Sequence, residues 1–291
     1  MSQPAEPDLV LSVKNLVVDY AVHGGTFRAV DDVSFDIPRG ATVAIVGESG
    51  CGKSTIAKAI VRLLKPASGA IVLNGQDIAQ MPARTLRPLR SKVQMVFQDP
   101  YGSLDPHLTA EDIVGEPVGL RGVRSAKDRR AEAARLLDQV GLPSSARGRR
   151  PSEFSGGQRQ RIGIARALAS QPDLLVCDEA TSALDVSVQA QVLQLLADIQ
   201  QQSGLTYLMI SHNLGVVREN SSTVIVMSKG QVVEQGPTEQ VINAPRKPYT
   251  RALRAAALDP LAIVGRKPRE VVSRLNKIEF LEDPALMEDA S

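Results

Sequence analysis

Strictly alternating apolar and polar residues early in the chain give way to continuous apolar runs further along. The segment Val33-Ser-Phe-Asp-Ile37 alternates at every position, which predicts a strand of an antiparallel sheet with one face in water. Asn74-Gly75 predicts a tight turn in the same layer. The runs at 43–46 and 174–177 are apolar throughout, which is typical of buried strands. We therefore expect an antiparallel layer beside a mostly parallel sheet.

The pattern becomes helical between residues 101 and 154. Ser125-Ala-Lys-Asp128 predicts a capping box, and Gly141 predicts the end of the helix after Val140. Ser155 is a good N-cap for a following helix over 158–168, whose apolar residues at 162, 165 and 168 have core-facing spacing. These segments predict a helical subdomain, at about 101–165, inserted into the sheet-forming chain.

A phosphate-binding loop stands between the apolar run 43–46 and a stretch expected to be helical, 55–64. It matches the pattern G-x-x-x-x-G-K-[ST] at every fixed position and consists of Gly47, Glu48, Ser49, Gly50, Cys51, Gly52, Lys53, Ser54 and Thr55. A strand that feeds a glycine-rich loop into a helix N-terminus directs backbone N–H groups at the phosphates of a nucleotide. Lys53 would pair with those phosphates, and the Ser54 hydroxyl would hold Mg²⁺. The sequence therefore predicts binding of a nucleoside triphosphate.

Two further motifs distinguish this chain from other proteins that share such a loop. They are Phe154-Ser155-Gly156-Gly157-Gln158 and the apolar strand from Leu174 that ends in Asp178-Glu179. Together they resemble the ATP-binding cassette family, whose signature usually begins with Leu where this chain has Phe154. Other elements follow in family order over about residues 8–258: Tyr20, Gln98, the segment 182–185 and His212. The resemblance implies ATP as the nucleotide. It also implies an α/β fold: a P-loop NTPase (RecA-like) core with an antiparallel β subdomain and an inserted α-helical signature subdomain.

The resemblance also assigns roles around the phosphates. Asp178 ends a buried strand, where its carboxylate can reach the hydration shell of Mg²⁺. Glu179 would polarise the attacking water, and His212 would contact the γ-phosphate and hold that water in line. A single His after a strand is more often a structural hydrogen-bonding group, so the position of His212 in the family pattern decides this assignment. Gln98 would touch a metal-bound water and the helical subdomain.

Other residues are expected to contact the nucleotide base or a second subunit. Tyr20 would stack on adenine, and Asp185 would lie at a dimer interface, although without the resemblance we would interpret it as a helix cap for 186–199. The signature helix begins with an anion-binding end. In this family that end completes the site of a partner subunit, so Ser155, Gly156, Gly157 and Gln158 would act in trans. Gly157→Asp is therefore expected to place a carboxylate against the partner's nucleotide.

Composition excludes several classes of protein. The chain has 291 residues and a net charge of +2 without a long basic stripe, which gives no case for binding nucleic acid. No apolar run is long enough to span a bilayer, and we expect a peripheral protein on the cytoplasmic face of the plasma membrane. The two cysteines, Cys51 and Cys177, indicate neither a disulfide framework nor a cysteine-rich metal site. Cys177 is expected in the core, whereas Cys51 could be reactive or inert.

The branch of the family is indicated by residues 96–106, which resemble the oligopeptide and dipeptide importer ATPases and, through Tyr101, their F-type subunit. Ile210-Ser-His-Asn-Leu214 and Pro248-Tyr-Thr250 point the same way. The implied partners are a second ATPase (a homologous D-type subunit or a second copy), two integral permease subunits and, indirectly, an extracytoplasmic solute-binding protein. That branch often has a cysteine-rich C-terminal segment, which this chain lacks. Its extension at 259–291 could be a docking helix or frayed.

Two other classes share the nucleotide chemistry. An exporter ATPase would carry the same motifs. A soluble cassette ATPase that acts on nucleic acid or ribosomes usually adds a coiled coil, zinc-ligand cysteines or a second cassette, and none is visible in the sequence. We therefore expect an ATPase subunit that drives uptake of oligopeptides, dipeptides or a similar small solute.

Overall fold

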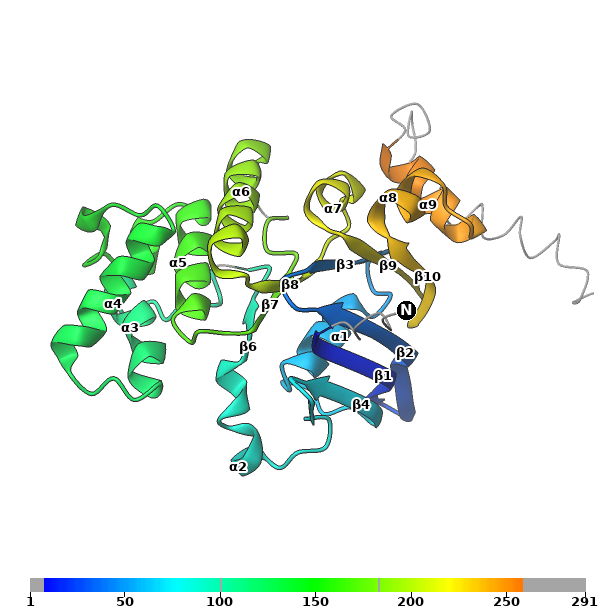
Figure 1. Ribbon diagram of the computed structural model, residues 1–291, viewed down its shortest axis with the longest axis horizontal. Helices are drawn as coiled ribbons and strands as arrows, with labels where there is room; N and C mark the ends of the chain where they lie inside the picture. Colours follow the sequence, from blue (N-terminus) through cyan, green and yellow to red (C-terminus); the bar gives the residue numbers. More distant parts are fainter. Residues whose placement is uncertain (1–7, 100, 183, 259–291) are drawn as a thin grey trace, which may run out of the picture.

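Two sheets form the centre of the molecule (Figure 1). The computed structural model describes residues 8–258 except 100 and 183. The first sheet is antiparallel and four-stranded in the order β2-β1-β4-β5. Its strands are β1 (Leu9–Val22), β2 (Gly25–Pro38), β4 (Ser68–Leu73) and β5 (Gln76–Asp77). The second has the order β10-β9-β3-β8-β7-β6 and is parallel except at β10. It contains β3 (Thr42–Gly47), β6 (Val93–Val96), β7 (Leu174–Asp178), β8 (Thr206–Ile210), β9 (Thr223–Ser228) and β10 (Gln231–Pro237).

The predicted character of each sheet is confirmed. In β2, Val33, Phe35 and Ile37 are buried whereas the two residues between them are exposed, so one face meets the core and the other meets water. All six residues of β3 and all five of β7 are buried. The turn Asn74-Gly75 joins β4 to β5 with positive φ at both residues, 48° and 79°. Two positive φ angles in succession give the twist that a two-residue hairpin needs.

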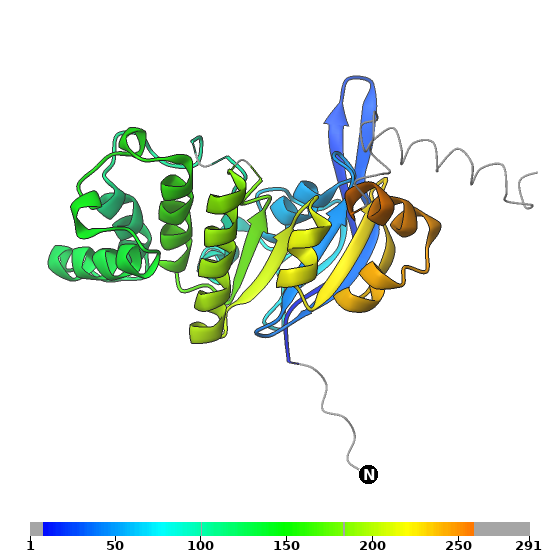
Figure 2. The same ribbon diagram turned by 90° about the horizontal axis from the view of Figure 1, so that it is seen from above.

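Helices lie at both ends of the sheet layer, as the two views in Figures 1 and 2 show. The helical region at one end holds α3 (Ala110–Leu120), α4 (Ala126–Gln139) and α5 (Gly156–Leu168). The other end holds α7 (Leu214–Asn220), α8 (Thr238–Asn243) and α9 (Pro248–Leu258). The remaining helices are α1 (Lys53–Ile60), α2 (Ala83–Leu86) and α6 (Val186–Ser203), with 3-10 turns at Leu89–Ser91, Ser144–Ala146 and Pro151–Glu153. Among the described residues, no helix is both long and apolar enough to cross a membrane.

The parallel sheet is buried because successive residues of its strands enter different hydrophobic clusters. In β3, Val43 and Ile45 pack toward α1 and the antiparallel sheet. Ala44 and Val46 pack toward α7, α8 and α9. Strand β7 likewise shares its side chains between the first cluster and the helical region. Burial on both faces explains the absence of alternation in these strands, and it fixes the strand ends from which the site residues project.

The helix ends agree in part with the predicted caps and correct the bounds of three helices. Ser125 caps α4 by accepting a hydrogen bond from the N–H of Asp128, which is one of the two bonds of the predicted capping box; the reciprocal bond to the Asp128 side chain is not made. Gly141 follows the last turn of α4 with φ 75°. Helix α1 spans 53–60 rather than 55–64, because Arg62 adopts φ 56° and the N–H groups at 63 and 64 turn back to Lys58. Helix α5 begins at residue 156 rather than 158, and α6 continues to residue 203 rather than 199.

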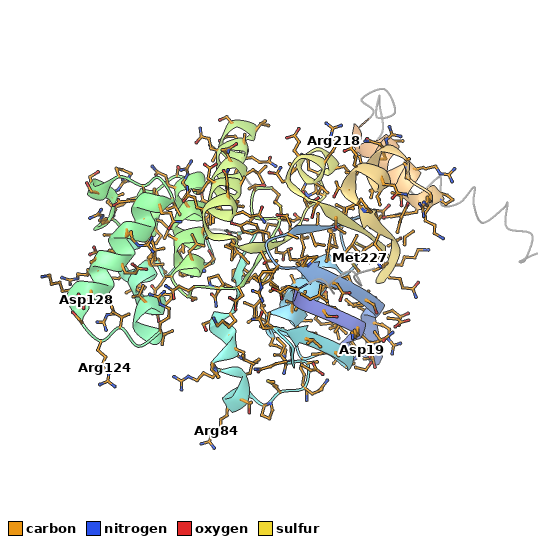
Figure 3. The ribbon with its side chains drawn as sticks, in the orientation of Figure 1. Asp19, Arg84, Arg124, Asp128, Arg218 and Met227 are labelled. Carbon is orange, nitrogen blue, oxygen red and sulfur yellow. The ribbon has the colours of Figure 1, made fainter. Side chains whose placement is uncertain are left out.

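Two arginine-rich segments of the helical region, 121–130 and 147–150, lie at the surface, with their arginines half-buried or exposed. Arg124 and Asp128 are at its outer edge, and Arg84 of α2 points away from the molecule (Figure 3). Arg135 and Arg147 form ion pairs with Glu132 and Asp138, respectively. Part of this charge is therefore neutralised locally.

Candidate functional site

The phosphate loop leaves the end of β3 and enters α1 through three residues of positive φ: Gly47 (153°), Gly50 (84°) and Gly52 (106°). Two of these positions also lack room for a side chain. A Cβ at Gly47 would lie 2.3 Å from the carbonyl oxygen of Met227, and one at Gly52 would lie 2.5 Å from that of Ala29. Glycine is therefore required both by the backbone conformation and by the close approach of neighbouring strands.

Lys53 is held inside the loop. Its side-chain ammonium donates to the carbonyl oxygens of Gly47, at 2.9 Å, and Glu48, at 2.7 Å, and the residue is only 4% exposed. These bonds stabilise a positive charge beside the backbone N–H groups that open α1. The arrangement suits an anion, because a fixed cation and a helix N-terminus act on the same place.

A cavity of about 260 Å³ lies over the loop and brings together residues from distant parts of the chain. It is lined by Tyr20, Phe27, Ala29, Ser49, Gly50, Gly52, Lys53, Ser54, Thr55, Gln98 and Glu179. The Tyr20 hydroxyl lies 3.3 Å from the Thr55 hydroxyl, which holds the ring at the edge of the cavity. Phe27 was not expected here. It pairs directly with Tyr20 across the β1–β2 hairpin and is 56% exposed, and a predicted hairpin register could have revealed it.

Ser54 and Asp178 form the link between the loop and the end of β7. The Ser54 hydroxyl donates to the Asp178 carboxylate over 2.9 Å. Burial raises the pKa of Asp178, while the hydrogen bond from Ser54 acts in the opposite direction. Two oxygen donors thus meet beside the cavity, and hydroxyl and carboxylate oxygens are ligands that suit Mg²⁺. The residues present fit the predicted cation.

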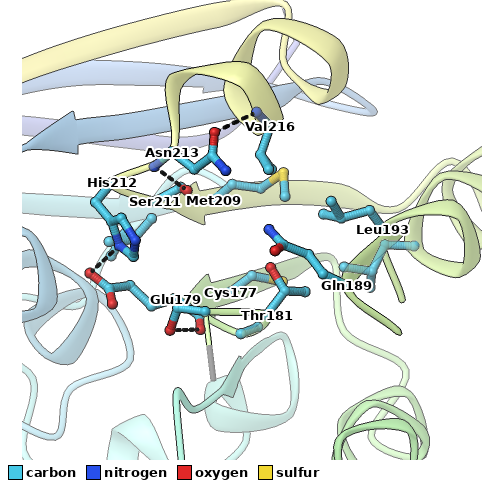
Figure 4. Close-up of a pocket in the computed structure, with 14 residues that line it drawn as sticks. Cys177, Glu179, Thr181, Gln189, Leu193, Met209, Ser211, His212, Asn213 and Val216 are labelled. Atoms are coloured by element: carbon cyan, nitrogen blue, oxygen red, sulfur yellow. Dashed lines mark hydrogen bonds and ion pairs between the residues drawn. The ribbon is translucent and has the colours of Figure 1, made fainter. Parts of the chain in front are cut away.

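Glu179 follows Asp178 and faces the cavity in an unusual backbone conformation. Its φ is 46°, uncommon for a residue other than glycine, and its N–H donates to the carbonyl oxygen of Ile210 over 3.0 Å. Its carboxylate accepts from the Gln98 side chain at 3.0 Å and lies 3.5 Å from Nδ1 of His212. Figure 4 shows His212 and Glu179 facing one another. Left-handed backbone of this kind is often retained at functional sites.

Gln98 also lies close to the helical region. On one side of it, the carbonyl oxygen of Phe97 accepts a hydrogen bond of 3.4 Å from Gln160 of α5. Further along, the guanidinium of Arg159 lies 4.0 Å from the centre of the Tyr101 ring. The segment around Gln98 thus contacts α5, in line with the expected contact with the helical subdomain. The contact of Gln98 with the Glu179 carboxylate was not expected, and its contact with a metal-bound water stays a prediction.

The signature segment caps α5 reciprocally. The Ser155 hydroxyl accepts from the N–H of Gln158, and the Gln158 side chain accepts from the N–H of Ser155. The two glycines differ in their surroundings. A Cβ at Gly157 would lie 2.3 Å from the Val188 side chain of α6, whereas one at Gly156 would lie 3.6 Å from Leu184. Gly157→Asp would therefore also disturb the packing of α5 against α6, so its expected effect on a partner's nucleotide stays a prediction that this substitution cannot test cleanly.

Asp185 lies at the N-terminus of α6. Its carboxylate accepts from the N–H of Val188 and from the Ser187 hydroxyl, both at 2.9 Å, and these bonds lower its pKa. The cap interpretation is thus confirmed by geometry. Neither Asp185 nor any signature residue lines the cavity over the phosphate loop. Within one chain the structure therefore separates the predicted site residues into two groups. The loop group lies at or beside the cavity over the phosphate loop, and the signature group consists of Ser155, Gly156, Gly157, Gln158 and Asp185.

Both cysteines are buried. Cys177, on β7, is 2% exposed, and burial raises the pKa of its thiol to about 12, in agreement with the expected core position. Burial also raises the pKa of Cys51, although Lys53 acts against this shift. A raised thiol pKa reduces the thiolate fraction at neutral pH. Of the two interpretations of Cys51, the structure favours the inert one.

Comparison with known proteins places this site in a family. The family model described as ABC transporter matches residues 30–182. The chain is 49% identical over 260 residues to a probable peptide ABC transporter ATP-binding protein, y4tS, of Sinorhizobium fredii, covering 87% of this chain and 74% of that protein. It is 43% identical over 282 residues to the glutathione import ATP-binding protein GsiA of Pectobacterium atrosepticum, covering 94% of this chain and 45% of that protein.

Solved structures agree with the sequence comparisons. The ATP-binding cassette MJ0796, in a dimeric post-hydrolysis state bound to ADP and Pi, superposes with a TM-score of 0.72 at 31% identity, covering 78% of this chain and 98% of that one. The cbiO1 protein of Clostridium perfringens, part of the ABC transporter complex cbiONQ, gives 0.72 at 27% identity, covering 87% and 97%. The predicted α/β cassette fold is confirmed, and the chain belongs to the ABC transporter family as one of its ATPases.

Proposed function

We propose that this ATPase powers import of oligopeptides, dipeptides or a similar small solute through separate transmembrane subunits. The proposal is supported by relatives named as peptide and glutathione import ATP-binding proteins. It also agrees with the segment 96–106 and with the tyrosine at 101, which resembles the F-type subunit of the importer pair. The solute would be selected by the binding protein and the permease.

The loop group would hold the triphosphate and its cation. Lys53 and the loop N–H groups would bind phosphate oxygens, and Tyr20 would stack on the base. Ser54, Asp178 and Gln98 would hold Mg²⁺ directly or through its waters. When bound, Mg²⁺ would neutralise charge on the phosphate oxygens. The hydrogen bond between the Ser54 hydroxyl and the Asp178 carboxylate supports this assignment, because it keeps two oxygen ligands next to each other.

Glu179 would act as the general base that takes a proton from the attacking water. The Gln98 amide and the His212 ring lie on its two carboxylate oxygens. These contacts would orient the carboxylate and leave His212 next to the terminal phosphate. The positive φ of Glu179 supports the role, since the surrounding structure holds this residue in a conformation that it would rarely adopt otherwise.

A second ATPase subunit would complete the site. The signature residues Ser155, Gly156, Gly157 and Gln158 and the helix cap Asp185 lie away from the loop cavity of their own chain, so they are available to a partner's nucleotide. In this arrangement residues 8–258 would form the cassette, with 101–165 as its helical subdomain and 259–291 as an extension. The pair would sit on two permease subunits at the cytoplasmic face of the membrane.

The convergence of Gln98 and His212 on Glu179, beside the Ser54–Asp178 pair, is the observation that carries the ATPase part of this proposal. Solute import is tested by purifying the protein from its native membranes and identifying the integral subunits that accompany it. The purified complex is then reconstituted in vesicles with its binding protein. ATP-dependent accumulation of peptides inside the vesicles is expected. Outward transport, or copurification with nucleic acid or ribosomes, would overturn the import assignment.

A further inference from the structure

Tyr249 of the C-terminal helix α9 contacts the phosphate loop at Glu48, a loop residue that does not line the nucleotide cavity. Its hydroxyl accepts a hydrogen bond of 3.4 Å from the N–H of Glu48, which is 201 residues away in the chain. Tyr249 is only 7% exposed, and Glu48 does not line the nucleotide cavity. The contact therefore lies on the side of the loop that faces the protein. The segment Pro248-Tyr249-Thr250 has no part in the nucleotide site described above.

The position of the Tyr249 hydroxyl is fixed by the packing of α9. At the start of the helix, the Glu234 carboxylate on β10 accepts from the N–H groups of Arg246, at 2.8 Å, and Lys247, at 3.1 Å. The Tyr249 ring belongs to the hydrophobic cluster that includes Val46 of β3 and Val226 of β9. The Tyr249 ring thus packs against β3 and β9, the same two strands that contact the phosphate loop at Gly47. A shift of the hydroxyl would therefore disturb this cluster.

Glu48 connects this contact to the loop lysine. Its N–H donates to Tyr249, and its carbonyl oxygen accepts from the Lys53 ammonium at 2.7 Å and from the N–H of Cys51 at 3.3 Å. The loop is secured at a second place, where the carbonyl oxygen of Cys51 accepts from the N–H of Gly230 at 3.0 Å. Burial raises the pKa of Tyr249 to about 12, so the phenol stays neutral at physiological pH.

We propose that Tyr249 is a positioning residue for ATP binding, which holds Glu48 and through it Lys53 in the conformation that receives phosphate. Without the hydroxyl, the Glu48 N–H loses a buried partner and the loop can adopt further conformations. ATP binding must then restrict the loop to the one conformation that receives phosphate, and the free energy required for this restriction lowers the affinity of the loop for ATP. The C-terminal helix, and not only the loop and its adjoining strands, would thus set the nucleotide affinity. The inference rests on this loop binding ATP, and it is independent of the transported solute.

The test compares Tyr249→Phe with Tyr207→Phe in the full chain. Both substitutions remove one tyrosine hydroxyl that bonds to backbone inside the protein, since Tyr207 donates to the carbonyl oxygen of Leu196 over 3.0 Å. Tyr207 lies in the cluster of the helical region, away from the loop. Melting temperatures of both variants, together with MgATP titration calorimetry and ATPase kinetics, separate a loss of stability from a loss of positioning.

Tyr249→Phe is expected to weaken MgATP binding about 3- to 10-fold, the change that one hydrogen bond provides. It should raise KM by a similar factor and change kcat at saturating ATP by less than about twofold. Tyr207→Phe should lower the melting temperature comparably and leave ATP affinity unchanged. Wild-type affinity in Tyr249→Phe, or an equal loss in both variants, would overturn the proposal. Failure of the unmodified chain to bind MgATP would instead contradict the nucleotide site itself.

Discussion

The Ser54 hydroxyl donates to the Asp178 carboxylate over 2.9 Å and joins two segments that are 124 residues apart. Ser54 is the second residue of α1, which the phosphate loop connects to β3, and Asp178 ends β7, with β8 between β3 and β7 in the sheet. Because parallel strands end at the same edge of a sheet, residues that follow different strands can meet there. The nucleotide site is therefore a consequence of strand order.

Lys53→Ala tests the binding role of the loop. The substitution removes the ammonium that bonds to the carbonyl oxygens of Gly47 and Glu48. Charged hydrogen bonds to phosphate contribute about 1.5–3 kcal/mol, so ATP affinity should fall by about 10- to 100-fold and transport should be lost. Titration calorimetry measures the affinity, and circular dichroism checks that the fold remains. Lys65→Ala, at an exposed lysine beyond the same helix, is the matched control. Unchanged ATPase turnover in Lys53→Ala would contradict the assignment of this loop.

Glu179→Gln separates binding from hydrolysis. The amide keeps the shape of the side chain and still offers an oxygen to Gln98, but it cannot take a proton from water. Hydrolysis should fall by about 10²- to 10⁴-fold, the usual effect of losing a general base. ATP binding should persist, and an ATP-bound dimer should accumulate in size-exclusion chromatography. If hydrolysis continued near the normal rate, His212, which lies 3.5 Å from this carboxylate, would become the better candidate for the base.

Local features of the fold could be predicted because each depends on neighbouring residues. The turn at Asn74-Gly75 requires residues that tolerate positive φ, and Ser155 and Asp185 cap their helices through bonds to residues three positions ahead. Such features are set by backbone geometry within a few residues, so they can be read from the sequence. The meeting of Ser54 and Asp178, which are 124 residues apart, was expected from the family resemblance instead.

Other features depend on how distant segments pack and were not predictable in this way. The collision between a side chain at 157 and Val188 follows from the approach of α5 to α6. The positive φ of Glu179 and the contact of Tyr249 with Glu48 also require the assembled sheet. Neither periodicity nor spacing in one sequence specifies such contacts.

The burial of both cysteines predicts slow thiol chemistry in the native protein. The raised pKa values of Cys51 and Cys177 keep both thiols protonated at neutral pH, and burial blocks access to them. Ellman's reagent should therefore label the folded chain much more slowly than the chain in denaturing guanidinium chloride, where both thiols should react. Cys51→Ser leaves Cys177 as the single thiol, so the labelling that this variant loses belongs to Cys51 of the phosphate loop. Labelling of native Cys51 at the rate of a free thiol would restore the reactive interpretation.

The different surroundings of Gly156 and Gly157 allow the trans role of the signature to be tested. Gly156 is the first residue of α5, has room for a Cβ, and would tolerate Asp well, because a negative charge at a helix N-terminus is stabilising. Gly156→Asp should preserve the fold and ATP binding at Lys53 of the same chain. It should impair hydrolysis at the partner's nucleotide, since a carboxylate would stand at the helix end that receives the phosphate.

Gly157→Ala serves as the packing control. Its Cβ would lie 2.3 Å from Val188, and overpacking of this kind costs about 1–3 kcal/mol. Val188→Ala in the same chain should recover part of that stability in thermal melts, but it should not rescue Gly156→Asp. In mixed dimers, nucleotide occupancy and hydrolysis are then measured at each site, with the phosphate-loop lysine intact in only one subunit. A defect of Gly156→Asp confined to its own subunit's nucleotide would mean that the signature acts in cis, and the two-subunit site would have to be abandoned.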